Sequence, residues 1–231
     1  MRTVVMWMVV AAWTAGAGVA AAGQTPERQA PEGTAPLPDM NAIAKALGVS
    51  CGHCHVARDF TSDANPKKVI ARQMLTMTRE INARVAAATG KATGTSVVVQ
   101  CATCHRGQPV PRSLSDTLVA TLGEKGDAAA AEQYRGLRTQ FYGRDTFDFS
   151  EQEFLALGQR LAEVRPDAAL ALLAVHLEFN PQSSNTYVVM SRAHVRKRDT
   201  PAAIAALKKA IEVEPNNGLA QGYLYQLEPR R

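Results

Sequence analysis

Residues 51–55 read CGHCH and residues 101–105 read CATCH. Both stretches follow the pattern Cys-x-x-Cys-His, and together they contain all four cysteines of the chain. Two thiols three residues apart can form thioether bonds to the two vinyl-derived carbons of one porphyrin, and the adjacent histidine then lies beneath the ring and binds its iron. The pattern therefore predicts two covalently attached haems c. The thioether anchors and proximal iron ligands are Cys51, Cys54 and His55 for the first haem, and Cys101, Cys104 and His105 for the second.

Three other uses of paired cysteines explain the sequence less well. The gap between the two pairs is long for a zinc ribbon, and a zinc site does not explain why a histidine follows both pairs. Structural disulfides suit an exported chain but leave the same question open. Thiol–disulfide exchange uses one Cys-x-x-Cys on a strand–helix scaffold, which this sequence does not show.

Few histidines remain to bind the other axial face of each iron. The chain has five, and His55 and His105 are assigned as proximal ligands. His176 and His194 lie at helix-packing positions, which favours a role in the core. His53 lies inside its own motif, where geometry points it away from the iron that the motif binds. It could reach another haem, but exposure to solvent is the stronger expectation.

Methionine is the better source of distal ligands. Met40 lies eleven residues before Cys51, and Met74 and Met77 lie on a predicted helix before the second motif. A methionine on an apolar helix stripe is usually a core side chain. That interpretation is weaker here because each motif has a methionine-bearing helix immediately upstream.

Capping signals define both of these helices. A short helix is expected over 40–47, with the aspartate before it as N-cap and Gly48 as its stop. A longer helix is expected over about 67–88, because Asn65 is a good N-cap and Pro66 suits the first helical position. Its apolar side chains recur every three or four residues, as in an amphipathic helix: Ile70, Met74, Met77, Ile81 and Val85.

The N-terminus resembles an export signal. Residues 1–22 combine a basic start, an apolar run and small residues at the end, as a secretory signal peptide does. Residues 23–38 are rich in proline and polar residues and read as a linker. The protein is therefore expected to act outside the cytoplasm, in the periplasm or its equivalent. An uncleaved signal that tethers it to the membrane is the alternative.

The basic charge of the chain is concentrated near the motifs. The net charge is +5, and residues 35–112 contain ten Lys or Arg against four Asp or Glu. An exported protein rarely meets nucleic acid, so we expect no nucleic-acid partner. Haem propionates are a better use for this charge because each needs donors or water. Candidate propionate contacts are Arg72, Arg79 and Arg106.

The C-terminal part contains a helical repeat. Pro181 and Pro215 end two similar helical pairs and lie 34 residues apart, which is the tetratricopeptide period. Small Ala169 and Ala203 occupy equivalent positions where helices must approach closely. Two further helices are expected at about 115–122 and 127–142. The predicted fold class is therefore all-α, divided as follows: signal peptide 1–22, linker 23–38, dihaem domain 39–112, helical connector 113–148 and tetratricopeptide-like repeats 149–231.

The stretches at 40–55, 68–82 and 101–107 together resemble the cytochrome subunit of bacterial photosynthetic reaction centres. The resemblance covers about residues 38–111 and includes the order helix, motif, helix, motif. In that family a methionine on the helix before each motif ligates the iron. The resemblance therefore implies Met40 as distal ligand of the first haem and Met74 of the second, with Met77 as runner-up.

Other features depart from that family. Its subunit normally has four haems and a lipid-anchoring cysteine, and the repeat-containing C-terminal part is foreign to it. Photosynthesis is therefore not implied. The expected function is that of an electron carrier rather than an enzyme. Its expected partners are redox proteins, such as a membrane electron-transfer complex, docked through the repeats. The alternatives are a dihaem peroxidase-type enzyme and a redox-sensing assembly protein.

Overall fold

The predicted all-α fold is confirmed by the computed structural model, which describes residues 39–92 and 98–228. These residues form ten α-helices and one short 3-10 helix, and the only strand-like feature among them is an isolated bridge between Val56 and Asp59. The predicted signal peptide and linker lie outside the described residues. Within the described part of the chain, no helix has the length and apolar character needed to span a bilayer.

The short helix before the first motif has the predicted bounds. Helix α1 spans Met40–Leu47, and the Asp39 carboxylate accepts hydrogen bonds from two backbone N–H groups of its first turn. The helix ends at Gly48, which adopts a left-handed conformation with φ 67°. This conformation favours glycine because a side chain would be strained there. The first motif follows as the 3-10 helix η1, Cys51–His53.

The long helix α2 spans Pro66–Thr89 and begins as predicted. The Asn65 side chain accepts a hydrogen bond from the backbone N–H of Lys67, and a left-handed Gly90 follows the last turn with φ 65°. The side chain of Asn82 makes two hydrogen bonds with the backbone of Val99, at 2.9 and 2.8 Å. These bonds fix α2 to the chain just before the second motif, which forms helix α3, Cys101–His105.

Helix α1 packs directly against the end of the second motif. The backbone N–H of Gly107 donates to the carbonyl of Ala46 over 2.7 Å. A Cβ atom placed on Gly48 would lie 2.2 Å from the Gly107 carbonyl oxygen, so the two backbones touch. Among the described residues of 39–112, Ala46 is the only buried hydrophobic side chain. The apolar side chains of this part therefore line cavities rather than a protein core.

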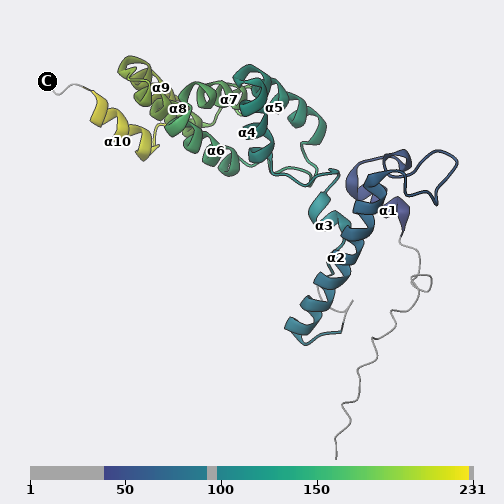
Figure 1. Ribbon diagram of the computed structural model, residues 1–231. Coiled ribbons are helices and arrows are strands. Elements are labelled where there is room, and N and C mark those ends of the chain that lie inside the picture. The colour runs from purple at the N-terminus through teal and green to yellow at the C-terminus, as the bar shows by residue number, and fades with distance from the viewer. Residues whose placement is uncertain (1–38, 93–97, 229–231) are drawn as a thin grey trace, which may run out of the picture. The chain divides into compact units, whose positions relative to one another are not determined.

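The remaining helices pack against their neighbours in the chain as three successive pairs followed by one last helix (Figure 1). They are α4 Leu114–Lys125, α5 Asp127–Phe141, α6 Glu151–Val164, α7 Pro166–Phe179, α8 Ser184–Arg196, α9 Thr200–Val213 and α10 Gly218–Leu227. The first residues of α7 and α9, Pro166 and Thr200, are 34 positions apart, which matches the period predicted for the repeat. The two small residues predicted at close helix contacts, Ala169 and Ala203, are fully buried.

One hydrophobic core joins α4 and α5 to the helices that follow. Leu118, Tyr134, Leu157 and Leu172 are all buried in this core. Helices α4 and α5 come from the predicted connector, and α6 and α7 come from the predicted repeats. Side chains from both sides of the predicted boundary at residue 148 thus share one core. The division of the chain at that residue stays a prediction.

A buried histidine lies at the centre of this core. His176 is fully buried on α7, and its Nδ1 is 3.1 Å from the hydroxyl of Tyr134. The ring of Phe154 stacks on its imidazole with centroids 4.4 Å apart. Burial lowers the pKa of His176 to about 4, so the ring is neutral near pH 7. His176 is thus a core side chain, as its position in the sequence suggested.

Candidate functional site

The first Cys-x-x-Cys-His motif lines an apolar cavity of about 190 Å³, termed here the first cavity. Three elements form its wall: α1, the 51–55 turn and the first turns of α2. The predicted ligand Met40 lines this cavity together with Cys51, Cys54 and His55. The structure therefore brings together every residue that the sequence assigns to the first haem.

The second motif lines a larger cavity of about 450 Å³, the second cavity. Cys101 and His105 from α3 and Met74 from α2 lie in its wall. Met77, the runner-up, is absent from the wall of either cavity. The structure thus brings Met74 together with the second motif, whereas Met77 lies one turn further along α2.

The two cavities have a common wall. Both are lined by side chains from α1, η1 and α2. The residues that line both are Ile43, Leu47, Cys54, Ala71 and Leu75. Cys54, an anchor of the first motif, therefore also contributes to the site of the second motif.

The two motif histidines have different hydrogen-bond environments. The Nδ1 atom of His105 lies 2.9 Å from the carbonyl oxygen of Gln108. An Nδ1–H that donates to a carbonyl fixes the tautomer and leaves Nε2 as the metal-binding atom. The Nδ1 atom of His55 is buried without a hydrogen-bond partner among the described residues, and its ring lies 5.2 Å from that of Phe60.

The donor set and the apolar surface fit a covalently bound haem. None of the four cysteines is paired in a disulfide, so each sulfur can form a thioether. The side chains of Met40 and Met74 are 47% and 40% exposed, and no residue of α2 is buried by protein. A flat apolar macrocycle in each cavity would remove these side chains from water. Within residues 39–92 and 98–228, no three or more His, Cys, Asp or Glu side chains lie close enough together to hold a metal ion.

A basic cluster closes the loop beside the first cavity. The Nζ of Lys68 donates to the carbonyls of Phe60, Thr61 and Ser62 at 2.8 to 3.0 Å. Arg72, a predicted propionate contact, also lines the first cavity and pairs with Asp63 over 2.6 Å. This hydrogen bond lowers the pKa of the Asp63 carboxyl.

The other two predicted propionate contacts are placed differently. Arg79 lies on α2, where its Nε is 3.3 Å from the carbonyl of Leu75. Arg106 follows α3 with a left-handed backbone, φ 48°, and lines a surface hollow with Thr103 and Cys104. Neither of these arginines lines either cavity.

His53 is the residue whose place the sequence did not predict. Its side chain is half-buried and lines the second cavity, although it belongs to the first motif. The second position between the cysteines has no fixed role in the attachment pattern. The histidine at this position was the only available signal; it left contact with another haem open, and solvent exposure was the stronger expectation.

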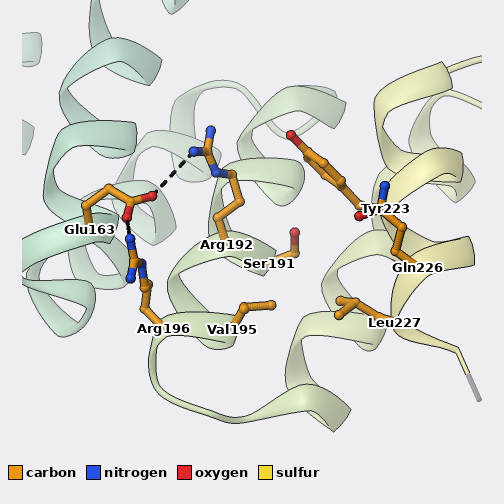
Figure 2. Close-up of a pocket in the computed structure, with 8 residues that line it drawn as sticks. All are labelled: Glu163, Ser191, Arg192, Val195, Arg196, Tyr223, Gln226 and Leu227. Carbon is orange, nitrogen blue, oxygen red and sulfur yellow. Dashed lines mark hydrogen bonds and ion pairs between the residues drawn. The ribbon is translucent and has the colours of Figure 1, made fainter.

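A separate hollow of about 240 Å³ lies between α8 and α10 (Figure 2). The carboxylate of Glu163 on α6 pairs with Arg192 and Arg196 on α8 along one side. Tyr223 and Leu227 from α10 lie along the other side. This hollow is charged on one wall and apolar on the other.

Comparison with known proteins gives a match over most of the described chain. The family model for the photosynthetic reaction centre cytochrome c subunit matches residues 39–192. This match extends well beyond residue 111, where the sequence resemblance was expected to end. The C-terminal helices up to most of α8 are therefore not foreign to the family, and their assignment as tetratricopeptide repeats remains a prediction.

Curated relatives match a shorter segment. Cytochrome c-554 of Chloroflexus aurantiacus is 42% identical over 67 residues, covering 29% of this chain and 16% of that protein. The photosynthetic reaction center cytochrome c subunit of Rubrivivax gelatinosus is 39% identical over 72 residues, covering 30% and 17%. Its counterpart in Thermochromatium tepidum is 39% identical over 62 residues, covering 27% and 14%. The chain thus spans about one sixth of the length of these relatives. No solved structure matches the chain.

Proposed function

Because the chain belongs to the family of photosynthetic reaction centre cytochrome c subunits, we propose that it is a dihaem c-type cytochrome that transfers electrons between redox partners outside the cytoplasm. One observation carries the proposal. Each Cys-x-x-Cys-His motif lines its own apolar cavity together with a methionine from another helix. For the first haem this arrangement provides both anchors and both axial ligands. For the second it provides the anchor Cys101 and both axial ligands, and the other anchor, Cys104, lines a neighbouring surface hollow.

The proposed ligand sets use His55 with Met40 and His105 with Met74. A haem supplies one-electron chemistry at its iron when bound. A histidine and a methionine fill both axial positions, which raises the reduction potential and disfavours substrate binding at the metal. The role of the chain is then to anchor and orient the haems and to shield them from solvent, which suits an electron carrier better than an enzyme.

The partner and the location follow from the family only in part. Two relatives are named as subunits of a photosynthetic reaction centre, which supports a membrane electron-transfer complex as the partner class. We propose that the segment 1–22 directs export and that the protein works at the outer face of the membrane.

The hollow between α8 and α10 is proposed to dock a redox partner. Arg192 and Arg196 are partly exposed at its rim, and the ring of Tyr223 offers apolar surface. Redox partners usually meet through small, transient interfaces. A basic rim beside an apolar patch suits such an interface because charge steers the encounter and apolar contact completes it.

Removal of one attachment site tests the haem count. The parent protein, produced in a strain that attaches haem c, is expected to contain two haems per chain by the pyridine haemochrome assay. The double variant Cys101→Ser/Cys104→Ser is expected to contain one, because both thioethers of the second haem are lost. Cys51→Ser/Cys54→Ser serves as the reciprocal control and is also expected to contain one. A parent protein with a single haem would refute the two-haem proposal.

Substitution of the two methionines of α2 tests the second distal ligand. Ferric haem with a sulfur ligand has a weak far-red absorption band. Met74→Ala is expected to remove the contribution of one haem to this band, about half of its intensity if the two haems contribute equally. Met77→Ala is the matched control, since Met77 lies on the same helix but lines neither cavity, and it should keep the full band. The opposite result would assign Met77 as the ligand.

A further inference from the structure

We propose that His53 is a second distal ligand for the iron of the second haem and binds it whenever Met74 does not. The inference rests on the proposed function, namely that the second motif carries a haem with Met74 as its distal ligand. It adds a metal-binding role for a residue of the first motif toward the haem of the other motif. The second haem site would thus contain an internal replacement ligand.

The first argument is position. His53 lines the second cavity together with Met74, Cys101 and His105, and it does not line the first cavity. It is half-buried, so part of its side chain is already out of solvent. The adjacent Cys54 lines both cavities, which places this part of the chain at their common wall.

The second argument is that the backbone of His53 is held in place. Its N–H donates to the carbonyl of Ser50 over 3.0 Å, and its carbonyl accepts a hydrogen bond from Nδ2 of Asn65 over 3.0 Å. Asn65 also caps α2, the helix that carries Met74. The two candidate ligands therefore extend from one connected segment. Only the two side-chain torsions of the histidine need to change for its ring to move within the cavity.

The third argument is chemical. Imidazole nitrogen is a good ligand for iron, and a neutral imidazole has one nitrogen with a free lone pair. When His53 replaces Met74, one iron–sulfur bond breaks and one iron–nitrogen bond forms, so no electron or proton needs to be supplied. Loss of the methionine sulfur ligand lowers the reduction potential of the haem, since methionine ligation raises it. Among the described residues, the ring of His53 has no hydrogen-bond partner.

The first cavity provides a contrast within the same protein. The only histidine in its wall is His55, the proximal ligand. Loss of Met40 therefore leaves that iron without another imidazole or methionine sulfur in the cavity wall, and the Nζ of Lys68, which also lines the cavity, is held by three backbone carbonyls. The two haem sites should respond differently to loss of the same kind of ligand.

The test compares Met74→Ala with Met40→Ala in the ferric two-haem protein. Electron paramagnetic resonance and visible spectra are expected to show that Met74→Ala keeps both irons low-spin, with one of them in bis-histidine form. Met40→Ala should convert one of its two irons to the high-spin form, which added imidazole returns to low-spin. The double variant Met74→Ala/His53→Phe should become high-spin at the second iron. Its high-spin signal should match that of Met40→Ala.

The outcomes separate this inference from the proposed function. If the Met74→Ala protein has two haems and a high-spin second iron, the role of His53 is overturned but the proposed function is not. A low-spin signal that persists in the double variant also overturns it, because another group must then be the ligand. A parent protein with fewer than two haems overturns the proposed function and this inference with it. If Met74→Ala does not fold, Met74→Leu fills nearly the same volume without a donor atom and has the same expected spectra.

Discussion

Gly48→Ala is expected to prevent assembly of the haem-binding part, whereas Gly90→Ala should be tolerated. Both glycines end a helix in the left-handed conformation, with φ 67° and 65°. That conformation alone costs a non-glycine residue about 1–2 kcal/mol. A Cβ at residue 48 would also lie 2.2 Å from the carbonyl oxygen of Gly107, whereas a Cβ at residue 90 meets nothing within 4 Å.

The additional cost at residue 48 comes from backbone that cannot move aside cheaply. The Gly107 N–H donates to the Ala46 carbonyl over 2.7 Å, and a shift that relieves the contact breaks this bond. Overpacking of this kind adds about 1–3 kcal/mol. The haem content of the purified protein and the midpoint of thermal loss of helix signal should both fall sharply for Gly48→Ala and only slightly for Gly90→Ala. Equal effects would show that the contact between α1 and the second motif is not needed for stability.

The second large effect is acid destabilisation of the C-terminal helices through His176. Its pKa is about 4 in the folded protein against 6.5 for the ordinary side chain, chiefly because burial penalises the charged form. Between these two values the unfolded chain binds a proton that the folded chain does not. The free energy of unfolding therefore falls as pH falls from 6.5 to 4, by about 1.4 kcal/mol per pH unit and about 3 kcal/mol in total.

Urea unfolding followed by the helix signal at several pH values from 8 to 4 checks this slope. His176→Phe should be less stable than the parent at pH 8, because the Tyr134 hydroxyl loses its partner, but its slope should be smaller by one proton. Tyr134→Phe removes the same hydrogen bond while His176 stays buried, so it should keep the steep slope. Parallel slopes for the parent and His176→Phe would show that the buried imidazole does not cause the acid sensitivity.

The helices around the motifs were predictable because their ends depend on local chemistry. Asp39 and Asn65 accept hydrogen bonds from backbone groups two or three residues away, and Gly48 ends α1 by its own backbone conformation. The Cys-x-x-Cys-His pattern is also local, since its chemistry lies within five consecutive residues. These features need no knowledge of the rest of the fold.

Contacts between distant residues were beyond the sequence pattern. The backbone contact between Gly107 and Ala46 joins residues 61 positions apart and leaves no trace in residue type except the glycines themselves. The pattern favoured solvent exposure for His53 over contact with another haem, because only the packing of α1 and α2 shows that the cavity of the second motif reaches this residue. Met74 and Met77 were equally good members of one apolar stripe. Their difference depends on which turn of α2 lies beside α3.

In the C-terminal helices, too, local and repeated features were predictable and contacts between distant residues were not. The 34-residue spacing and the small residues at close helix contacts could be predicted, because a repeat places the same residue types at equivalent positions twice. The inclusion of α4 and α5 in the same core could not be predicted, since their apolar residues do not recur at that spacing. The packing of Tyr134 against His176 likewise joins two helices that no pattern in the sequence connects.

The common wall between the two cavities limits how this protein can be divided or tuned. Helix α2 contributes Ala71 and Leu75 to both cavities, and α1 contributes Ile43 and Leu47 to both. A chain cut between the two motifs would therefore not yield two independent one-haem proteins, because the fragment with the second motif would lack the part of its pocket that α1 and η1 supply. A substitution at Leu75 would change the surroundings of both haems at once. An engineer who wishes to adjust one redox centre alone should choose side chains outside this wall, such as Phe60 for the first and Val110 for the second.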